Sequence, residues 1–167
     1  MSQSLLIVTS NAVEQTCADV GGYSEQEMAS EFERFFKAQP ELCDFIVELT
    51  GESDQKIQEL SLYLSYMVFK TVERCREEMA PVTHLMIEET FRESERWIEK
   101  LNQVESTAVQ SAILSSFESD SEPFLLQYVI AEINQALEDG TELDDEQKGE
   151  IFFVLKTVIS TLVKETV

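Results

Sequence analysis

Apolar residues recur at spacings of three and four along most of the chain, which predicts helices rather than strands. The clearest start is Ser24 with Glu27, a capping box in which each side chain satisfies a free amide of the first turn. The helix that follows extends to about Ala38. Pro40 then opens a short helix that Gly51 ends, because proline suits a first helical position and glycine suits a terminus.

Two longer and more apolar stretches predict the centre of the fold. Residues 53–79 and 144–164 each contain a window of thirteen residues, 60–72 and 151–163, of which nine are apolar. A helix that is apolar nearly all round is buried inside a protein. Neither window approaches the roughly 20 residues that a membrane span needs. We therefore expect two core helices and no membrane association.

Three further helices are predicted between these two, at 81–101, 106–117 and 121–138. Pro81 starts the first, and a second capping box, Ser119 with Glu122, precedes the last. The chain is therefore expected to be all-α. We expect a single domain over residues 1–167, folded as a bundle of six to eight helices.

The sequence allows more than one interpretation of the N-terminal segment and of the symmetry of the bundle. Residues 1–22 read as a peripheral N-terminal helix or arm, with a helix from Ser4 to Val20, although Leu6-Ile-Val-Thr reads equally well as a short strand. The segment that starts at Pro40 resembles the one that starts at Pro123, and a very apolar helix follows each. A weak two-fold internal duplication is therefore a hypothesis.

Composition narrows the class of protein. The chain has 167 residues, 5 glycines and 3 prolines, which is the length of one domain and too little turn material for an all-β fold. A formal charge of -21 disfavours nucleic acid and anionic membranes as partners, because both would be repelled. Three widely spaced cysteines and the absence of Lys or Arg before Arg34 argue against secretion, so we expect a cytoplasmic protein.

Candidate chemistry is sparse. His84 is the only histidine, and with Glu88 four residues on it forms the one weak candidate pair for a metal ligand set. The interleaving of Arg92, Arg96 and Lys100 with glutamates indicates a salt-bridged solvent face on the same helix. Phosphate-binding glycine loops and the nucleophile elbow of hydrolases are missing from the sequence. We therefore expect no cofactor and no catalytic residues, and a non-enzymatic role is favoured over an enzymatic one.

The distribution of charge is more informative than its total. Residues 104–147 contain eleven acids and no Lys or Arg, which is about half of the net charge. The same stretch contains the apolar helix at 121–138, and an acidic rim beside an apolar helix suits a basic, amphipathic partner. The predicted interaction surface consists of Glu118, Asp120, Glu122, Glu138, Asp139, Glu142, Asp144, Asp145 and Glu146.

The function that this pattern favours is a protein-interaction or adaptor module with an acidic surface and a protein partner, basic in the simplest case. Two helices that are apolar nearly all round also suggest a homo-oligomer. Two alternatives stay open. One is a helical protein that binds a metal or ligand through carboxylates, and the other is an acidic chaperone or decoy for basic partners.

Overall fold

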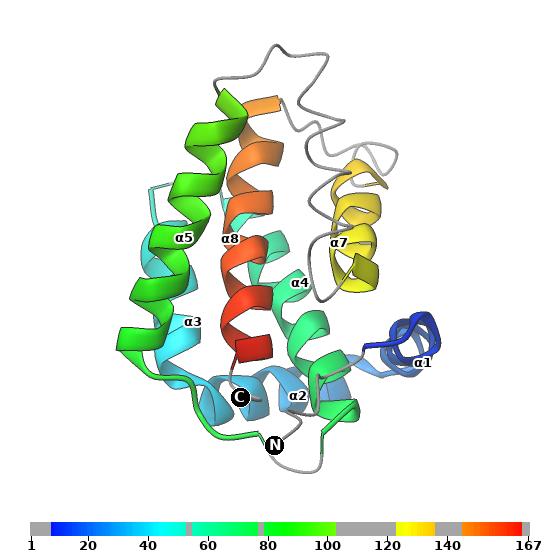
Figure 1. The fold of residues 1–167 in the computed structure, drawn as a ribbon. Coiled ribbons are helices and arrows are strands. Elements are labelled where there is room, and N and C mark those ends of the chain that lie inside the picture. Colours follow the sequence, from blue (N-terminus) through cyan, green and yellow to red (C-terminus); the bar gives the residue numbers. More distant parts are fainter. Residues whose placement is uncertain (1–7, 53–54, 77–78, 103–122, 136–144, 165–167) are drawn as a thin grey trace, which may run out of the picture.

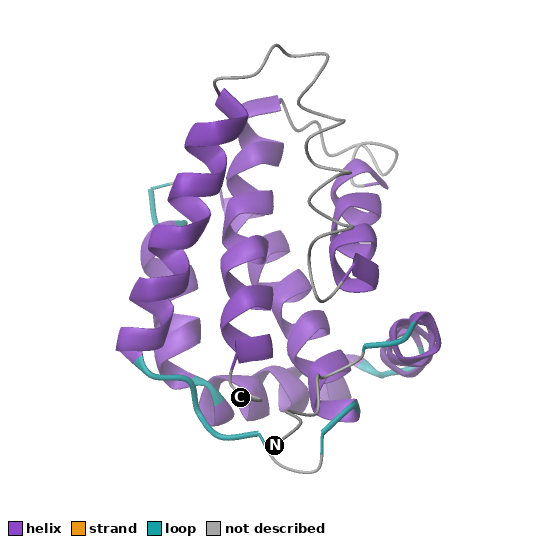
Figure 2. Cartoon of the chain, in the orientation of Figure 1, coloured by secondary structure: helices purple, strands orange, loops and turns teal. Residues whose placement is uncertain are grey.

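A computed structural model describes residues 8–52, 55–76, 79–102, 123–135 and 145–164, and Figures 1 and 2 show that every regular element in them is a helix. The helices are α1 (Ser10–Gly21), α2 (Glu25–Ala38), α3 (Pro40–Leu49), α4 (Gln55–Arg74), α5 (His84–Asn102), α7 (Pro123–Gln135) and α8 (Asp145–Lys164). The prediction of an all-α bundle of six to eight helices is confirmed, because these residues form seven helices and no strand.

Two predicted helix starts are confirmed in atomic detail. The Ser24 hydroxyl accepts a hydrogen bond from the Glu27 amide at 3.1 Å, and the Glu27 carboxylate accepts one from the Ser24 amide at 3.2 Å. Pro40 is the first residue of α3. The predicted helix at 106–117 and the capping box of Ser119 with Glu122 lie outside the described residues.

The predicted starts of α1 at Ser4 and of α5 at Pro81 are wrong. In both helices a threonine caps the first turn instead. The Thr9 hydroxyl accepts a hydrogen bond from the amide three residues on at 3.1 Å, and the Thr83 hydroxyl does the same at 3.3 Å. A side-chain oxygen that accepts from the first turn defines where a helix begins, whatever the apolar spacing before it suggests.

Helix α4 ends at Arg74, before its predicted end at residue 79. The amides of Cys75 and Arg76 donate to carbonyls three residues back, at 3.0 and 3.2 Å. Bonds of this kind tighten the last turn, and the chain then leaves the helix.

Helices α4 and α8 form the centre of the bundle, as their apolar sequences predict. Helix α8 lies between α5 and α7 and packs against both, and it also packs against α4 behind it (Figure 1). Six apolar side chains of α8 are at most 1% exposed: Ile151, Val154, Leu155, Val158, Ile159 and Leu162. A homo-oligomer was expected because α4 and α8 are apolar nearly all round. Other helices of the same chain cover both, so this pattern no longer calls for a second copy, and the homo-oligomer stays a prediction.

The first three helices cover α4. Helix α1 contacts α4 and α7, and its buried side consists of Ala12, Thr16 and Val20. Helix α2 contacts α3 and α4, and α3 also contacts α5 and α8. No helix in the described ranges is long and apolar enough to cross a membrane.

The proposed duplication remains a hypothesis. Helices α3 and α7 each begin with a proline, and each packs against the apolar helix that follows it. Helices α4 and α8 then pack against each other. This arrangement agrees with two related helix pairs but does not test their relationship.

A charged network joins α2 to α4. The Glu31 carboxylate accepts hydrogen bonds from Arg34 at 2.8 Å, from the Tyr66 hydroxyl at 2.8 Å and from the Lys70 ammonium. Arg34 also donates two hydrogen bonds to the Glu73 carboxylate, at 2.6 and 2.9 Å. Hydrogen bonds between charged groups are roughly twice as strong as neutral ones, so this network fixes α2 on α4.

The network also perturbs the titration of Glu31. The hydrogen bond from Arg34, joined by those from Lys70 and Tyr66, lowers the pKa of Glu31 from 4.5 to about 2 and outweighs the opposing effect of its partial burial. The ionised carboxylate therefore stabilises the fold at pH values above about 4.5. That stabilisation is lost as the pH falls through about 2.

Replacement of the Glu31 carboxylate tests this network. We expect Glu31→Gln to lower the free energy of unfolding at pH 7 by about 2 kcal/mol, because hydrogen bonds to a charged group are lost. The difference from wild type should shrink as the pH falls from 4.5 towards 2. Urea unfolding at several pH values measures it, with Glu33→Gln as the control, because Glu33 is exposed and pairs with Lys37 within its own helix. Equal effects of the two substitutions would contradict the network's role.

Candidate functional site

A groove runs along one side of α5, and its first part lies between α3 and α5. This part, the α3–α5 compartment, has a volume of about 440 Å³. Its apolar lining consists of Phe45, Leu49, Ile87 and Phe91, and its polar rim of Glu48, His84, Glu88, Arg92 and Glu95. An apolar floor with a few polar groups on the rim is the usual composition of a protein's binding site.

The second part of the groove lies between α5 and the start of α8. This α5–α8 compartment has a volume of about 500 Å³ and is lined by Glu95, Glu99, Glu146, Gly149, Glu150 and Phe153. Glu95 lines both compartments, so they adjoin. We call the two together the acidic groove.

A row of three aromatic rings joins the two compartments. The ring of Phe91 on α5 meets that of Phe45 on α3 edge-on at 5.8 Å between centroids, and that of Phe153 on α8 edge-on at 5.2 Å. Edge-to-face aromatic pairs contribute about 0.5–1.5 kcal/mol each beyond the area they bury. The row therefore fixes the relative positions of the three helices that form the groove.

Helix α5 separates the residues of the groove from those of the core by its helical period. His84, Glu88, Phe91, Glu95 and Glu99 are spaced by four, three, four and four residues, so they share one stripe. A second stripe faces α8 and includes the buried residues Thr90 and Ser94, which hydrogen bond to that helix. One helix thus contributes both to the core and to the groove.

Buried hydroxyl pairs attach α5 to α8. Thr90 hydrogen bonds to Thr161, and the Thr157 hydroxyl donates to Ser94 at 3.1 Å. All four side chains are at most 3% exposed. The three threonine hydroxyls also have carbonyl acceptors three or four residues back in their own helices, so the pairs add contacts between helices without leaving a threonine hydroxyl dependent on them.

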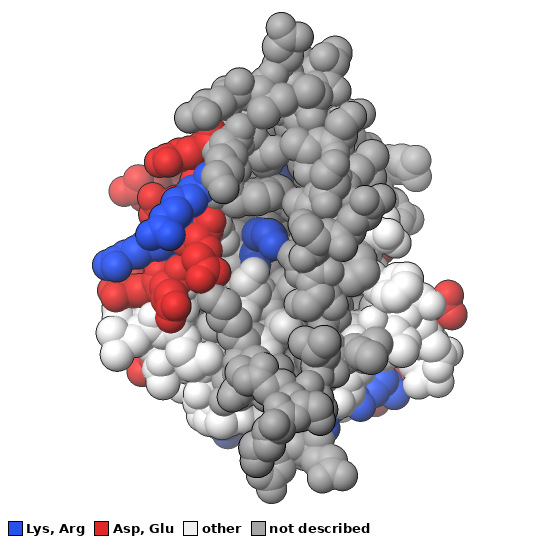
Figure 3. Space-filling view, viewed as in Figure 1, with Lys and Arg blue, Asp and Glu red and all other residues white. Residues whose placement is uncertain are grey.

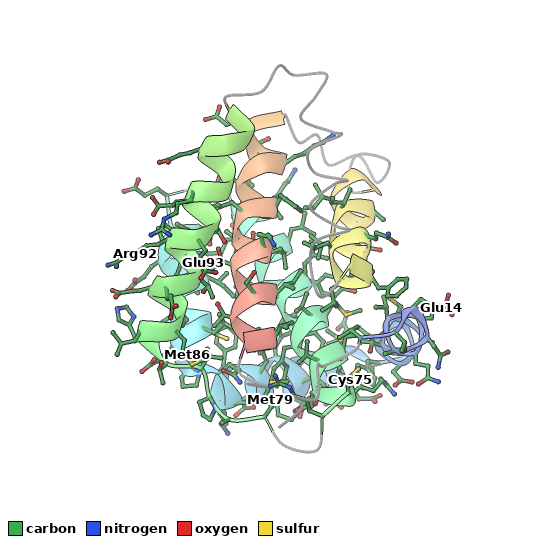
Figure 4. All side chains as sticks on the ribbon, in the orientation of Figure 1. Glu14, Cys75, Met79, Met86, Arg92 and Glu93 are labelled. Carbon is green, nitrogen blue, oxygen red and sulfur yellow. The ribbon has the colours of Figure 1, made fainter. Side chains whose placement is uncertain are left out.

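Among the described residues, the lining of the groove carries six carboxylates, one guanidinium and one imidazole. The carboxylates belong to Glu48, Glu88, Glu95, Glu99, Glu146 and Glu150. Acidic side chains also gather over α5 in the space-filling view, at its left, with basic ones among them (Figure 3). Arg92 extends outward from α5, away from α8 (Figure 4). Carboxylates concentrated along a hollow with apolar walls produce a focused negative potential.

The predicted pair of His84 and Glu88 lies on the rim of this groove. The imidazole Nε2 of His84 is 3.0 Å from a carboxylate oxygen of Glu88, and 72% of the His84 side chain is exposed. Within the ranges that the structure describes, no group of three or more His, Cys, Asp or Glu residues is arranged to hold a metal ion. The pair can contribute charge and hydrogen bonds to a ligand at the rim.

The predicted acidic surface is only partly described. Seven of its members lie outside the described residues: Glu118, Asp120, Glu122, Glu138, Asp139, Glu142 and Asp144. Asp145 is the first residue of α8, and Glu146, which is exposed, lines the α5–α8 compartment. One member of the predicted surface is therefore placed in the groove.

Sequence reasoning missed most of the groove. The sequence does show that Glu95 and Glu99 share a helical face with the pair of His84 and Glu88. That spacing alone predicts a face exposed to solvent and not a groove. Glu48 and Glu150 come from other helices, and no local pattern links them to α5. Their convergence depends on how α3 and α8 pack against α5.

A second cluster of titratable groups lies where α1, α4 and α7 meet. Burial raises the pKa of the Cys17 thiol and of the Tyr63 and Tyr128 hydroxyls, and Cys17 and Tyr128 share a hydrogen bond. The negative charge of Glu132 acts on all three in the same direction. These groups are therefore protonated at neutral pH and stabilise the packing of the three helices.

The reactivity of the Cys43 thiol can be predicted from its burial. It is fully buried, and burial, with a smaller contribution from Asp44, raises its pKa to about 12. Because the thiolate is the reactive form, we expect Cys43 to resist N-ethylmaleimide at pH 8 and to react once urea unfolds the chain. Peptide mass spectrometry of labelled protein measures this. Labelling of native Cys43 as fast as in urea would contradict its assignment to the core.

Comparisons of this chain with protein-family models, with curated proteins and with solved structures each found no match.

Proposed function

We propose that this protein is an interaction module that binds a basic, amphipathic segment of a partner protein in the acidic groove. The observation that supports this most is the combination, in one groove, of an aromatic row with six carboxylates. The apolar floor offers area to bury, and the glutamates select for positive charge. Interfaces of this type obtain affinity from the buried centre and specificity from the charged rim.

Lysine and arginine side chains suit this groove for a further reason. Each has an apolar stem that packs on aromatic rings and a charged end that reaches a carboxylate. A guanidinium can also lie over an aromatic ring, as Arg34 lies over Phe69 within this chain at 5.4 Å. A cationic partner also relieves the repulsion among the glutamates.

The test is binding of a fluorescein-labelled 18-residue peptide, with Leu and Phe on one helical face and Lys on its flanks. We expect the triple substitution Glu88→Gln, Glu95→Gln and Glu99→Gln to weaken binding at least tenfold, because loss of about 1.4 kcal/mol corresponds to a factor of ten. Fluorescence anisotropy at 50 mM and 300 mM NaCl measures it. Wild-type binding should weaken with salt, because salt screens the attraction between exposed charges.

The matched control replaces Glu33, Glu59 and Glu89 with Gln. All three are exposed and none lines the groove, and Glu89 is on α5 itself. Both triple variants have the same net charge, so a non-specific attraction would weaken equally in both. We expect the control to change affinity less than threefold. Equal weakening of the two variants, or no binding by wild type at low salt, would refute the proposed function.

A further inference from the structure

We infer that the segment bound by the acidic groove is a helix with one large apolar residue and, two turns away on the same face, a pair of Lys or Arg residues. This inference rests on the proposed function and specifies its partner. Three observations support it, namely the different chemistry of the two compartments, their separation along α5, and the helical nature of every described element.

The two compartments select different side chains. The α3–α5 compartment has an aromatic and aliphatic floor formed by four side chains, Phe45, Leu49, Ile87 and Phe91. Among the residues that the structure describes, the α5–α8 compartment is lined by four glutamates, by Gly149 and by Phe153. An apolar side chain of the partner therefore gains most binding free energy in the first compartment. Cationic side chains gain most in the second.

The separation of the compartments follows from their positions on α5. Residues 84–95 contribute to the first and residues 95–99 to the second, so their centres are about seven residues apart. At 1.5 Å of rise per residue this is about 11 Å along the helix axis. In a bound helix that runs along α5, the same distance is again about seven residues, and a side chain seven residues on returns to the same face.

A helix suits this site better than an extended segment. An extended peptide on an apolar floor needs a strand edge to satisfy its amides and carbonyls, and the described elements are all helices. A helix satisfies its own backbone and offers side chains at three, four and seven residue intervals. The groove is itself built from helices that use the same spacing.

The experiment compares two isomeric 18-residue peptides of the same composition. The matched peptide has Phe at one position and Lys seven and eight positions further on, which places all three on one face. The mismatched peptide has the two Lys residues five and nine positions from Phe, which places them on the opposite side. Each is made with Phe towards the N-terminus and towards the C-terminus, and circular dichroism confirms equal helicity.

Fluorescence anisotropy gives the affinity of each peptide for wild type and for the double variant Glu99→Gln with Glu146→Gln. We expect the matched peptide, in its better orientation, to bind wild type at least tenfold more tightly than the mismatched one. The double variant should reduce this preference at least threefold, because it removes two of the four carboxylates that line the second compartment. The control variant Glu33→Gln with Glu59→Gln should keep it.

The remaining outcomes separate the two proposals. Equal affinities for the two peptides, with binding that still depends on Glu88 and Glu95, would overturn the helical spacing and leave the proposed function intact. No binding of any peptide to wild type would overturn both. A preference of unchanged size in the double variant would also overturn the inference, because the carboxylates of the second compartment would not be its source.

Discussion

The packing of α8 against both α4 and α5 is the interaction on which the rest of the structure depends. One side of α8 buries aliphatic residues such as Leu155 and Val158, which form the core with α4. Another side presents Thr157 and Thr161 to hydroxyls of α5. Because α8 holds α5 by this stripe, the adjoining stripe of α5 remains available beside α3 and the start of α8, and the acidic groove forms there.

The groove shows how a highly charged chain can hold carboxylates close together in a compact fold. Carboxylates brought together along one hollow repel each other, which disfavours the compact state. The aromatic row of Phe45, Phe91 and Phe153 offsets this repulsion by packing the three helices together beneath the charges. In the network around Glu31 the carboxylate is attracted to its neighbours instead, because it accepts hydrogen bonds from the cationic groups of Arg34 and Lys70. This attraction joins α2 to α4. Glutamate therefore joins two helices in the network around Glu31 and supplies negative charge along the groove.

Sequence alone predicted the parts of the fold that depend on local chemistry. The capping box of Ser24 with Glu27 and the proline at the start of α3 are interactions within one turn, and both are found. The burial of α4 and α8 follows from their composition. The threonine caps of α1 and α5 were missed because apolar spacing continues past them. The groove could not be predicted, because Glu48, Glu95 and Glu150 come from three helices, and their meeting depends on tertiary packing such as the hydrogen bond between Thr90 and Thr161.

The proposed function makes the acidic groove a binding surface for a basic amphipathic segment. Amide chemical shifts of ¹⁵N-labelled protein, followed while the matched peptide is added, test it most directly because they locate the bound peptide without any substitution. We expect the largest changes at residues 45–49, 84–99 and 146–153, which contribute the lining of the two compartments. Changes concentrated on α1 and α7, or distributed over all described helices in proportion to exposed acidic residues, would contradict it.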